Sequence, residues 1–262
     1  MTHTFIIAEA AVTWERDLEQ AYRSIDAAKA CGADAWKTQW TSSIERMAQR
    51  RGQASGEVYR RLLWPAEYHA LLAAHCQKTG IEYMCTVFLP DDVAVIAPHV
   101  KRFKIAAREC TDAEFTEAHH GRDVIMSRNK GQKVTAPIGW RHLHCVSRYP
   151  TALEDLGLEC LRARRLYGNL HPNLPIYSDS LYHGLSDHAT SLLTGALAVA
   201  CGATIVEHHV RMYDTPPDNP DYPHSHSMEA SFCRTAECDS PEFLPEFKVY
   251  CQNIREAERA MG

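Results

Sequence analysis

Gly184-Leu185-Ser186-Asp187-His188 and Glu207-His208-His209 are the two stretches that decide the fold of this chain. The uncharged segment 190–201 between them predicts a buried helix, and the β-branched run just before Glu207 predicts a strand. Strand, loop, helix and strand in this order form a βαβ unit, which implies a parallel sheet. Because neighbouring parallel strands end at the same edge about 4.8 Å apart, we expect His188 and His209 within reach of one divalent ion.

The second of these strands also predicts which of its side chains share a face. Side chains alternate across a strand, so Glu207 and His209 lie on one face together with Ile205. The opposite face then carries His208. His209, rather than His208, is therefore the expected partner of His188.

Length, composition and charge favour a single large α/β domain. The chain has 262 residues, 45% of them hydrophobic and 23% charged, with a formal net charge of −5, and barrels of the α/β class run near 250 residues. This mildly negative net charge does not indicate the basic surface that nucleic-acid-binding proteins use. No apolar stretch approaches the roughly twenty residues of a membrane helix, and the N-terminus shows no signal peptide, so we expect a cytoplasmic protein. The ten cysteines form no Cys-x-x-Cys pair, which is typical of reduced, buried cysteines rather than of disulfides or a zinc knuckle.

Strand and helix signals alternate along the chain. The expected strands are 4–9, 34–39, 82–87, 102–105, 124–127, 143–147 and 204–209, and the expected helices are 17–31, 65–79, 91–97, 112–120, 152–166, 190–201 and 241–261. Strand seven has two candidates, 175–178 and the residues just before Gly184. Residues 41–63 are expected as a flap over the barrel mouth, and residues 128–140 lack a helical period, so the fifth crossover helix should be reduced to a loop. The pattern predicts one (β/α)8 TIM barrel over residues 1–262.

In this fold the chemistry sits at the carboxyl ends of the strands. Two lysines from different strands, together with several hydroxyl groups, form a natural site for an anion such as phosphate or carboxylate. Two histidines with a nearby carboxylate are an adequate site for Mn²⁺ or Mg²⁺, and a weaker one for zinc. The candidates at these ends are Glu9, Lys37, Lys104, Glu109, Ser127, Ser147, Tyr149, Ser186, His188, Glu207 and His209.

The same segments resemble the N-acetylneuraminate (sialic acid) synthase family. The motifs that carry the resemblance are Phe5–Glu9, Ala30–Gln39, Phe103–Ile105 with Glu109, Ser127, Leu143–Thr151, Gly184–His188 and Val206–His209. They span nearly the whole chain but only the barrel domain of the family. The last expected helix ends at residue 261, so we expect the barrel domain alone, without the family's C-terminal antifreeze-like domain.

This resemblance implies a phosphoenolpyruvate-dependent synthase, a transferase that adds a three-carbon enolpyruvyl unit to a sugar or sugar-like aldehyde and releases phosphate. It implies a divalent metal cofactor, Mn²⁺ or Mg²⁺, and small-molecule substrates, with no nucleic-acid or membrane partner. The sequence does not fix the oligomeric state, so a homodimer stays open. The implied roles are catalytic for Glu9, Lys37 and Glu109, substrate-binding for Lys37, Lys104, Ser127, Ser147, Tyr149 and Ser186, and metal-binding for His188 and His209.

Several positions depart from the family pattern. Ala106-Ala107 replaces Gly-Ser after the strand-four lysine, which removes a phosphate donor that Arg108 or Arg128 is expected to replace. Val12–Glu15 replaces Asn-His-Asn-Gly, and the Pro-Asp-His segment is disturbed around Asp221–His224, so its aspartate has no secure position. These departures leave the acceptor open.

Two other functions remain alternatives from the sequence. One is a metal-dependent aldolase or lyase that acts on a sugar phosphate. The other is a degenerate barrel that binds a ligand or partner without turnover, because fold alone does not fix chemistry.

Overall fold

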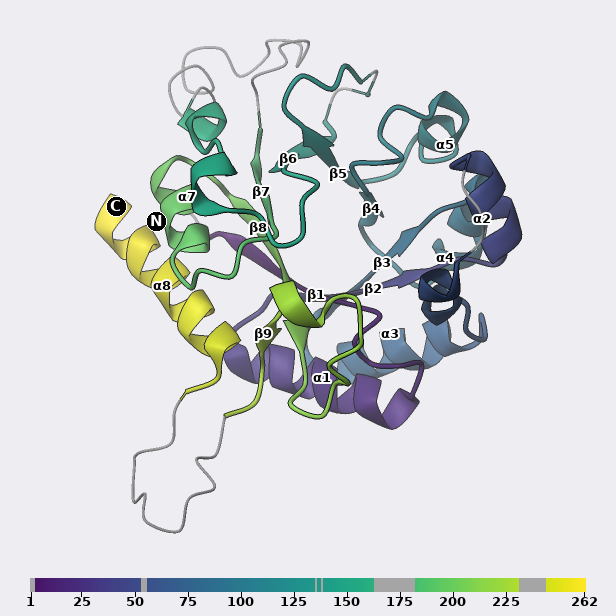
Figure 1. The fold of residues 1–262 in the computed structure, drawn as a ribbon, viewed down its shortest axis with the longest axis horizontal. Coiled ribbons are helices and arrows are strands. Elements are labelled where there is room, and N and C mark those ends of the chain that lie inside the picture. The colour runs from purple at the N-terminus through teal and green to yellow at the C-terminus, as the bar shows by residue number, and fades with distance from the viewer. Residues whose placement is uncertain (1–2, 53–55, 135, 138, 163–181, 231–243) are drawn as a thin grey trace.

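A computed structural model describes residues 3–52, 56–134, 136–137, 139–162, 182–230 and 244–262. Its strands β1 to β8 are all parallel, each pairs with the next, and β1 pairs with β8, so the sheet closes into a barrel surrounded by helices (Figure 1). The strands are β1 Phe5–Ala11, β2 Ala35–Trp40, β3 Glu82–Val87, β4 Phe103–Ile105, β5 Val124–Asn129, β6 Arg141–Cys145, β7 Gly184–Asp187 and β8 Ile205–Arg211, with a short β9 His226–Ser227 beside β8. The predicted TIM barrel is confirmed.

Most of the expected helices are present with shifted ends. The helices are α1 Leu18–Cys31, α2 Ile44–Arg50, α3 Tyr68–Thr79, α4 Pro90–Ile96, α5 Ala113–Glu117, α7 Thr194–Ala200 and α8 Glu246–Met261, and the 3-10 turns are η1 Glu57–Leu62, η2 Leu153–Asp155 and η3 Tyr222–His224. A further helix begins at residue 159, inside the expected span 152–166, and residues 163–166 lie outside the described part of the chain.

The ends of α1 follow from local chemistry. The side chain of Asp17 accepts hydrogen bonds from the backbone N–H groups of Glu19 and Gln20, which satisfies two of the free donors at the helix start. Gly32 ends the helix at φ +102°, a backbone conformation that residues with a Cβ rarely adopt. Helix α1 then lies beside α3, and α7 lies against α8 (Figure 1).

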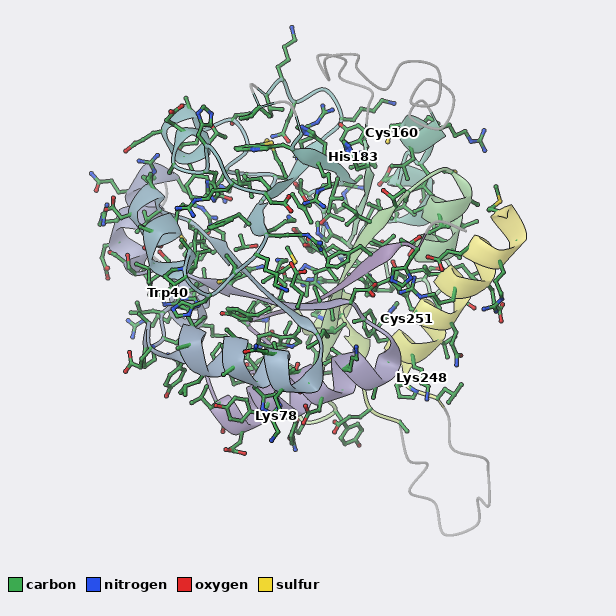
Figure 2. The ribbon with its side chains drawn as sticks, turned by 180° about the vertical axis from the view of Figure 1, so that it is seen from behind. Trp40, Lys78, Cys160, His183, Lys248 and Cys251 are labelled. Atoms are coloured by element: carbon green, nitrogen blue, oxygen red, sulfur yellow. The ribbon has the colours of Figure 1, made fainter. Side chains whose placement is uncertain are left out.

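The inside of the barrel is divided into an apolar floor and a polar mouth. Side chains lie inside the barrel and in the layer between the strands and the helices (Figure 2). The floor is one buried apolar cluster contributed by inward-facing strand residues, namely Ile7, Ala35, Met84, Ile125, Leu143 and Ile205. Because this cluster closes the end of the barrel where the strands begin, ligand access is left to the carboxyl end.

The position of strand seven differs from the sequence prediction. The strand is Gly184–Asp187 itself, later in the chain than either candidate, and residues 175–178 lie outside the described residues. Strand β7 approaches β8 so closely that a Cβ on residue 184 would overlap the carbonyl oxygen of Ile205. Glycine is therefore required there, and a glycine that reads as a loop residue is in fact the first residue of a strand.

The crossover between β5 and β6 agrees with the prediction. Residues 130–134, 136–137 and 139–140 contain no helix, so the loop reading holds for this described part of the crossover. None of the helices in the described residues has the length and apolar character needed to cross a membrane. The cysteines in these residues are free, and most are buried, as expected.

Candidate active site

A cavity of about 560 Å³ opens at the carboxyl ends of the strands. It is lined by side chains from most strands of the barrel and from the loops that follow them. Every residue to which the sequence assigned a role is among them, namely Glu9, Lys37, Lys104, Glu109, Ser127, Ser147, Tyr149, Ser186, His188 and His209. The predicted residues therefore share one cavity at the carboxyl end of the barrel, as the sequence predicts.

Glu9 reaches this cavity because side chains alternate along β1, and Ile7, two residues earlier, also faces the barrel interior. The register against β2 shifts between Glu9 and Ala11, and Ala11 has a positive φ of 45°. This bulge bends the strand immediately after Glu9. The backbone N–H of Ala11 donates to Oε1 of Glu9 at 2.6 Å, which fixes the carboxylate.

Two lysines and two glutamates form a buried cluster above the apolar floor. Lys37 forms ion pairs with Glu9 and, at 3.6 Å, with Oε2 of Glu207. Lys104 lies 3.4 Å from Oε1 of Glu207. The four side chains are at most 6% exposed, so the two positive and two negative charges balance each other in a region that water does not screen.

Burial and neighbouring charges shift the titration of this cluster. Burial lowers the pKa of Lys37 to about 8, and the positive charge of Lys104 acts in the same direction. Burial raises the pKa of Glu207, but the ammonium groups of Lys104 and Lys37 more than offset this, and the net pKa lies below the usual value. Glu207 is therefore ionised at neutral pH and holds both lysines in place.

Hydroxyl groups complete the anion-binding side of the cavity. Lys37 donates to Thr86 and Lys104 to Ser127, each at 2.9 Å, and Ser186 donates to Oε1 of Glu207 at 2.9 Å. These hydroxyls share the lysines' side of the cavity, so an anion that enters would meet both ammonium and hydroxyl donors.

Of the two arginines expected to replace the lost phosphate donor, only Arg108 lies at the cavity. Arg108 lines the cavity beside Ala106 and Ala107. Arg128 is buried on the other face of β5, where its guanidinium packs 4.2 Å from the ring centre of Tyr182. Alternation along the strand explains this, because Ser127 occupies the inward position. Arg128 as a donor in the mouth is therefore wrong.

The predicted histidine pair lies together at the rim. The ring centres of His188 and His209 are 5.5 Å apart, and the ring of Tyr149 lies 4.1 Å from that of His188. Nδ1 of His188 lies 2.8 Å from the carbonyl oxygen of Val146. Since a carbonyl only accepts, Nδ1 carries the proton and Nε2 keeps its lone pair for a ligand.

Two residues of the loop after β8 join His209. Ligand atoms of His209, Asp221 and His224 all lie within 4.8 Å of one another. Nδ1 of His209 and Nε2 of His224 are buried and have no hydrogen-bond partner among the described residues. Burial lowers the pKa of His209 well below its usual value and that of His188 to about 4, so both imidazoles are neutral at pH 7. Neutral imidazoles beside a carboxylate fit a divalent cation.

The opposite face of β8 shows that the predicted alternation is right. His208 points outward into the helix layer, where its ring lies 4.6 Å from that of Tyr250 on α8. Tyr250 donates to the buried carboxylate of Asp187 at 2.7 Å. His208 therefore belongs to the packing between strand and helix, while Glu207 and His209 face the cavity.

Comparison with known proteins places this arrangement in a family. The model of the NeuB family matches residues 24–235, which is most of the chain. The chain belongs to the NeuB family. This membership confirms the resemblance drawn from the motifs at the strand ends, and it confirms an enzyme of the synthase type.

Relatives of the NeuB-family chain carry assigned activities. The N,N'-diacetyllegionaminic acid synthase of Legionella pneumophila is 30% identical over 98% of this chain and 73% of its own length. The pseudaminic acid synthase of Campylobacter jejuni is 28% identical over 98% of this chain and 75% of its own length. A sialic acid synthetase from Leptospira borgpetersenii has the same fold, with a TM-score of 0.76 and 24% identity over 99% of this chain and 85% of that one.

Sequence reasoning missed several residues that line the cavity of this NeuB-family chain. Glu207 was recognised at a strand end but received no role of its own, although its shared face with His209 was a usable signal. Thr86 lies in a correctly predicted strand, where alternation alone did not single it out. Arg51, Asp221 and His224 come from long connections, whose path into the mouth has no periodic signal.

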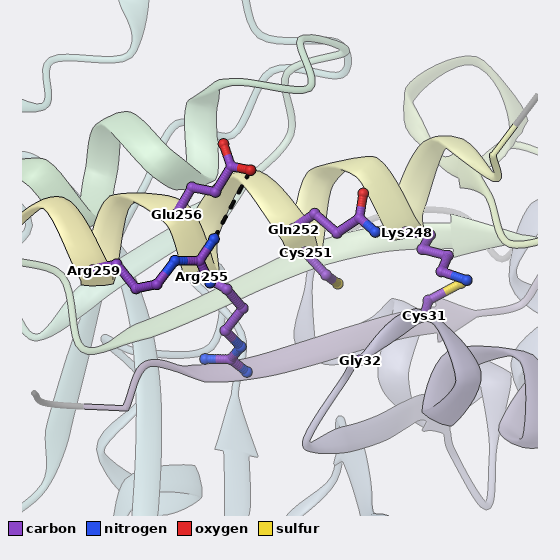
Figure 3. A pocket seen from close by; sticks show the side chains of 8 residues that line it. All are labelled: Cys31, Gly32, Lys248, Cys251, Gln252, Arg255, Glu256 and Arg259. Carbon is purple, nitrogen blue, oxygen red and sulfur yellow. Dashed lines mark ion pairs between the residues drawn. The ribbon is translucent and has the colours of Figure 1, made fainter.

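A second cavity of about 530 Å³ lies elsewhere on the NeuB-family barrel. It is lined by Cys31 and Gly32 at the end of α1 and by residues of α8 that include Lys248, Cys251 and Arg255 (Figure 3). It contains none of the predicted site residues. The candidate active site is therefore the mouth cavity.

Proposed function

We propose that the chain is a phosphoenolpyruvate-dependent, divalent-metal-assisted condensing enzyme. It adds the three-carbon enolpyruvyl unit to a sugar or sugar-like aldehyde and releases phosphate. The observation that carries this proposal is the shared cavity, which holds two buried lysines with their hydroxyl partners and a cluster of imidazoles with a carboxylate. Relatives named as synthases of sialic, legionaminic and pseudaminic acids support the reaction class.

The lysine side of the cavity is the proposed site for the phosphate and carboxylate of phosphoenolpyruvate. Lys37 and Lys104 supply positive charge, and Thr86, Ser127 and Ser186 supply hydroxyl donors. Because Glu9 and Glu207 already neutralise the lysines, an incoming anion competes with these carboxylates. The proposed binding therefore includes a rearrangement of the ion pairs of Lys37 and Lys104.

The histidine side of the cavity is the proposed metal site. His188 and His209 are the primary candidates, and Asp221 and His224 lie close enough to His209 to add to the donor set. When bound, Mn²⁺ or Mg²⁺ supplies a Lewis acid for the aldehyde oxygen and a template that orients water. Tyr149, whose ring packs against His188, covers this side of the mouth.

The reaction balances without a further co-reactant. The electron pair of the C2–C3 double bond of phosphoenolpyruvate forms the new bond to the aldehyde carbon, and the aldehyde oxygen takes a proton. Water bonds to C2 and gives up its protons as the bond between C2 and the phosphate oxygen breaks. Glu9 and Glu109 are the proposed groups that hold and pass these protons, and holding both reactants in one cavity supplies part of the rate.

Phosphate release from phosphoenolpyruvate in the presence of Mn²⁺ tests the proposal. The assay uses a panel of aldehydes that includes hexosamines, pentoses and nucleoside aldehydes. We expect release that depends on one class of aldehyde and that is lost in His188→Ala, while His120→Ala, on an exposed ring, keeps it. Normal turnover by His188→Ala would remove the metal role, and cleavage of a keto acid without phosphate release would favour a metal-dependent aldolase.

A further inference from the structure

An arginine from the connection after α2 reaches across the mouth to a proposed catalytic carboxylate. Arg51 directly follows α2, and Glu109 follows β4, yet the two side chains are 12% and 8% exposed and form an ion pair. Nε and one terminal nitrogen of Arg51 both donate to Oε1 of Glu109, at 2.9 and 2.5 Å. Both donors thus meet the same oxygen.

The second oxygen of Glu109 is left without a partner. Oε2 is buried and has no hydrogen-bond partner within the described chain, and Glu109 lines the cavity. A buried polar atom that forms no hydrogen bond costs about 1–3 kcal/mol. Such an atom at the wall of an active-site cavity is open to a hydrogen bond with water or with a substrate group that enters the cavity.

The guanidinium of Arg51 packs near two aromatic rings. It lies 4.7 Å from the ring centre of Phe88 and 5.7 Å from that of Tyr59. These contacts fix the plane of the guanidinium and hence the direction of its two donors. The neighbouring Arg50 points elsewhere, because it pairs with Asp112 and Glu114 at the start of α5.

We propose that Arg51 is the positioning residue of Glu109: by occupying Oε1, it leaves Oε2 as the one oxygen through which Glu109 meets the acceptor substrate. This inference rests on the proposed function and adds a requirement to it. An N–H donor needs an unprotonated oxygen, so any proton on Glu109 resides on Oε2. When that proton moves, the Oε2–H bond breaks, an O–H bond forms on the acceptor oxygen, and the charge left on Glu109 faces Arg51.

The position of Oε2 of Glu109 also limits which acceptor substrates fit the cavity. An acceptor seated against Glu109 presents an oxygen to Oε2, as a hydroxyl that donates to the carboxylate or as a carbonyl that accepts from the acid. Tyr59, Leu62 and Phe88 form the less polar wall next to this position. A planar or apolar part of the acceptor therefore packs on the same wall that holds Arg51.

The first test does not depend on activity. Burial raises the pKa of Glu109, and the charge and hydrogen bonds of Arg51 act in the opposite direction. In ¹³C NMR of protein labelled at glutamate carboxyls, with the signal assigned by Glu109→Gln, the titration midpoint of Glu109 should move to higher pH in Arg51→Ala. It should stay in place in the matched control Arg50→Ala. An unchanged midpoint in Arg51→Ala overturns the inference.

The second test separates positioning from a merely structural role. With phosphoenolpyruvate, Mn²⁺ and the preferred aldehyde, Arg51→Ala should lower kcat by about tenfold to a hundredfold while the KM for phosphoenolpyruvate stays unchanged. Millimolar guanidinium, which carries the same planar donors as the lost side chain, should restore part of the rate, and ammonium should not. A kcat equal to that of Arg50→Ala, or a loss that guanidinium leaves unchanged, contradicts the proposed role.

Further outcomes keep the two proposals apart. If the wild-type protein releases no phosphate with any aldehyde, the proposed function fails, while the NMR midpoint still decides whether Arg51 controls the ionisation of Glu109. If Arg51→Ala does not fold by circular dichroism, Arg51→Lys replaces it. Lysine keeps the charge but lacks the planar pair of donors, so we expect a nearly normal midpoint with a reduced kcat. A normal kcat in Arg51→Lys would contradict the need for both donors.

Discussion

Glu207→Gln is the substitution that most sharply tests the buried charge cluster. Glutamine keeps the shape of the side chain and an oxygen for the hydroxyl of Ser186, which donates to Glu207 at 2.9 Å. It removes the negative charge that lies 3.6 Å from Lys37 and 3.4 Å from Lys104. Two ammonium groups are then left near each other with only Glu9 to balance them.

The size of the effect follows from these distances. At an effective dielectric constant of about 20, each pair has a gross attraction of about 4–5 kcal/mol, which is partly offset by the desolvation of the charges. Removing one partner of a buried ion pair costs about 3–5 kcal/mol in unfolding free energy. For a chain of this size, about 2–4 °C of Tm corresponds to each kcal/mol. The Tm of Glu207→Gln should therefore fall by about 6–20 °C.

The loss of unfolding free energy in Glu207→Gln should also depend on pH. Lys37, with its pKa lowered to about 8 by burial, titrates below its unfolded value, so its deprotonation in the folded state raises stability as pH increases. Loss of Glu207 lowers this pKa further, and the variant sheds the proton at lower pH than the wild type. The difference in unfolding free energy between the wild type and Glu207→Gln should become smaller as pH rises toward 8 and stay constant above pH 8.

Thermal unfolding by circular dichroism in phosphate-free buffer at several pH values measures both effects. The control is Glu159→Gln, because Glu159 is 62% exposed and pairs with Lys130 at the surface, where water screens the pair. Inorganic phosphate should raise the Tm of Glu207→Gln more than that of the wild type, since it replaces the lost negative charge. A Tm within about 2 °C of the wild type, which corresponds to at most about 1 kcal/mol, would refute the reasoning.

Three further substitutions probe the anion site, the metal site and the barrel. Lys104→Met should weaken binding of inorganic phosphate at least tenfold by calorimetry, or about 1.4 kcal/mol, whereas Lys101→Met, on an exposed side chain, should not; equal affinities would exclude Lys104 from the site. His209→Ala should weaken Mn²⁺ binding, measured by electron paramagnetic resonance, by more than the roughly tenfold to hundredfold loss expected when a residue that only hydrogen-bonds to a metal ligand is removed; unchanged affinity would remove His209 from the metal site. Gly184→Ala should give no folded protein because its Cβ overlaps the backbone of β8, while Gly56→Ala has open space and should fold; a folded Gly184→Ala by circular dichroism would contradict the close approach.

The sequence predicted the parts of the molecule that have a repeating signal. Strand β3 agrees residue for residue with its prediction, and alternation in β8 correctly separated Glu207 and His209 from His208. The position of β7 was wrong because Gly184 reads as a turn residue, although it is required by close contact with β8.

The rest of the site depends on where long connections go in space. Asp221 and His224 join His209 only after the loop beyond β8 folds back over the mouth, and Arg51 reaches Glu109 only through the fold of the connection after α2. Neither path has a period in the sequence. A strand end can be predicted from hydrophobic pattern, whereas a loop residue at the same cavity requires the coordinates.

The fate of the bridging oxygen of phosphoenolpyruvate tests the central claim most directly. The substrate carries ¹⁸O between C2 and phosphorus, and the released phosphate is analysed by mass spectrometry after reaction with Mn²⁺ and the preferred aldehyde. Water attack at C2 breaks the carbon–oxygen bond, so the account predicts the label in phosphate and an unlabelled C2 carbonyl in the product. Label retained in the keto acid, or phosphate released at the same rate without an aldehyde, would contradict it.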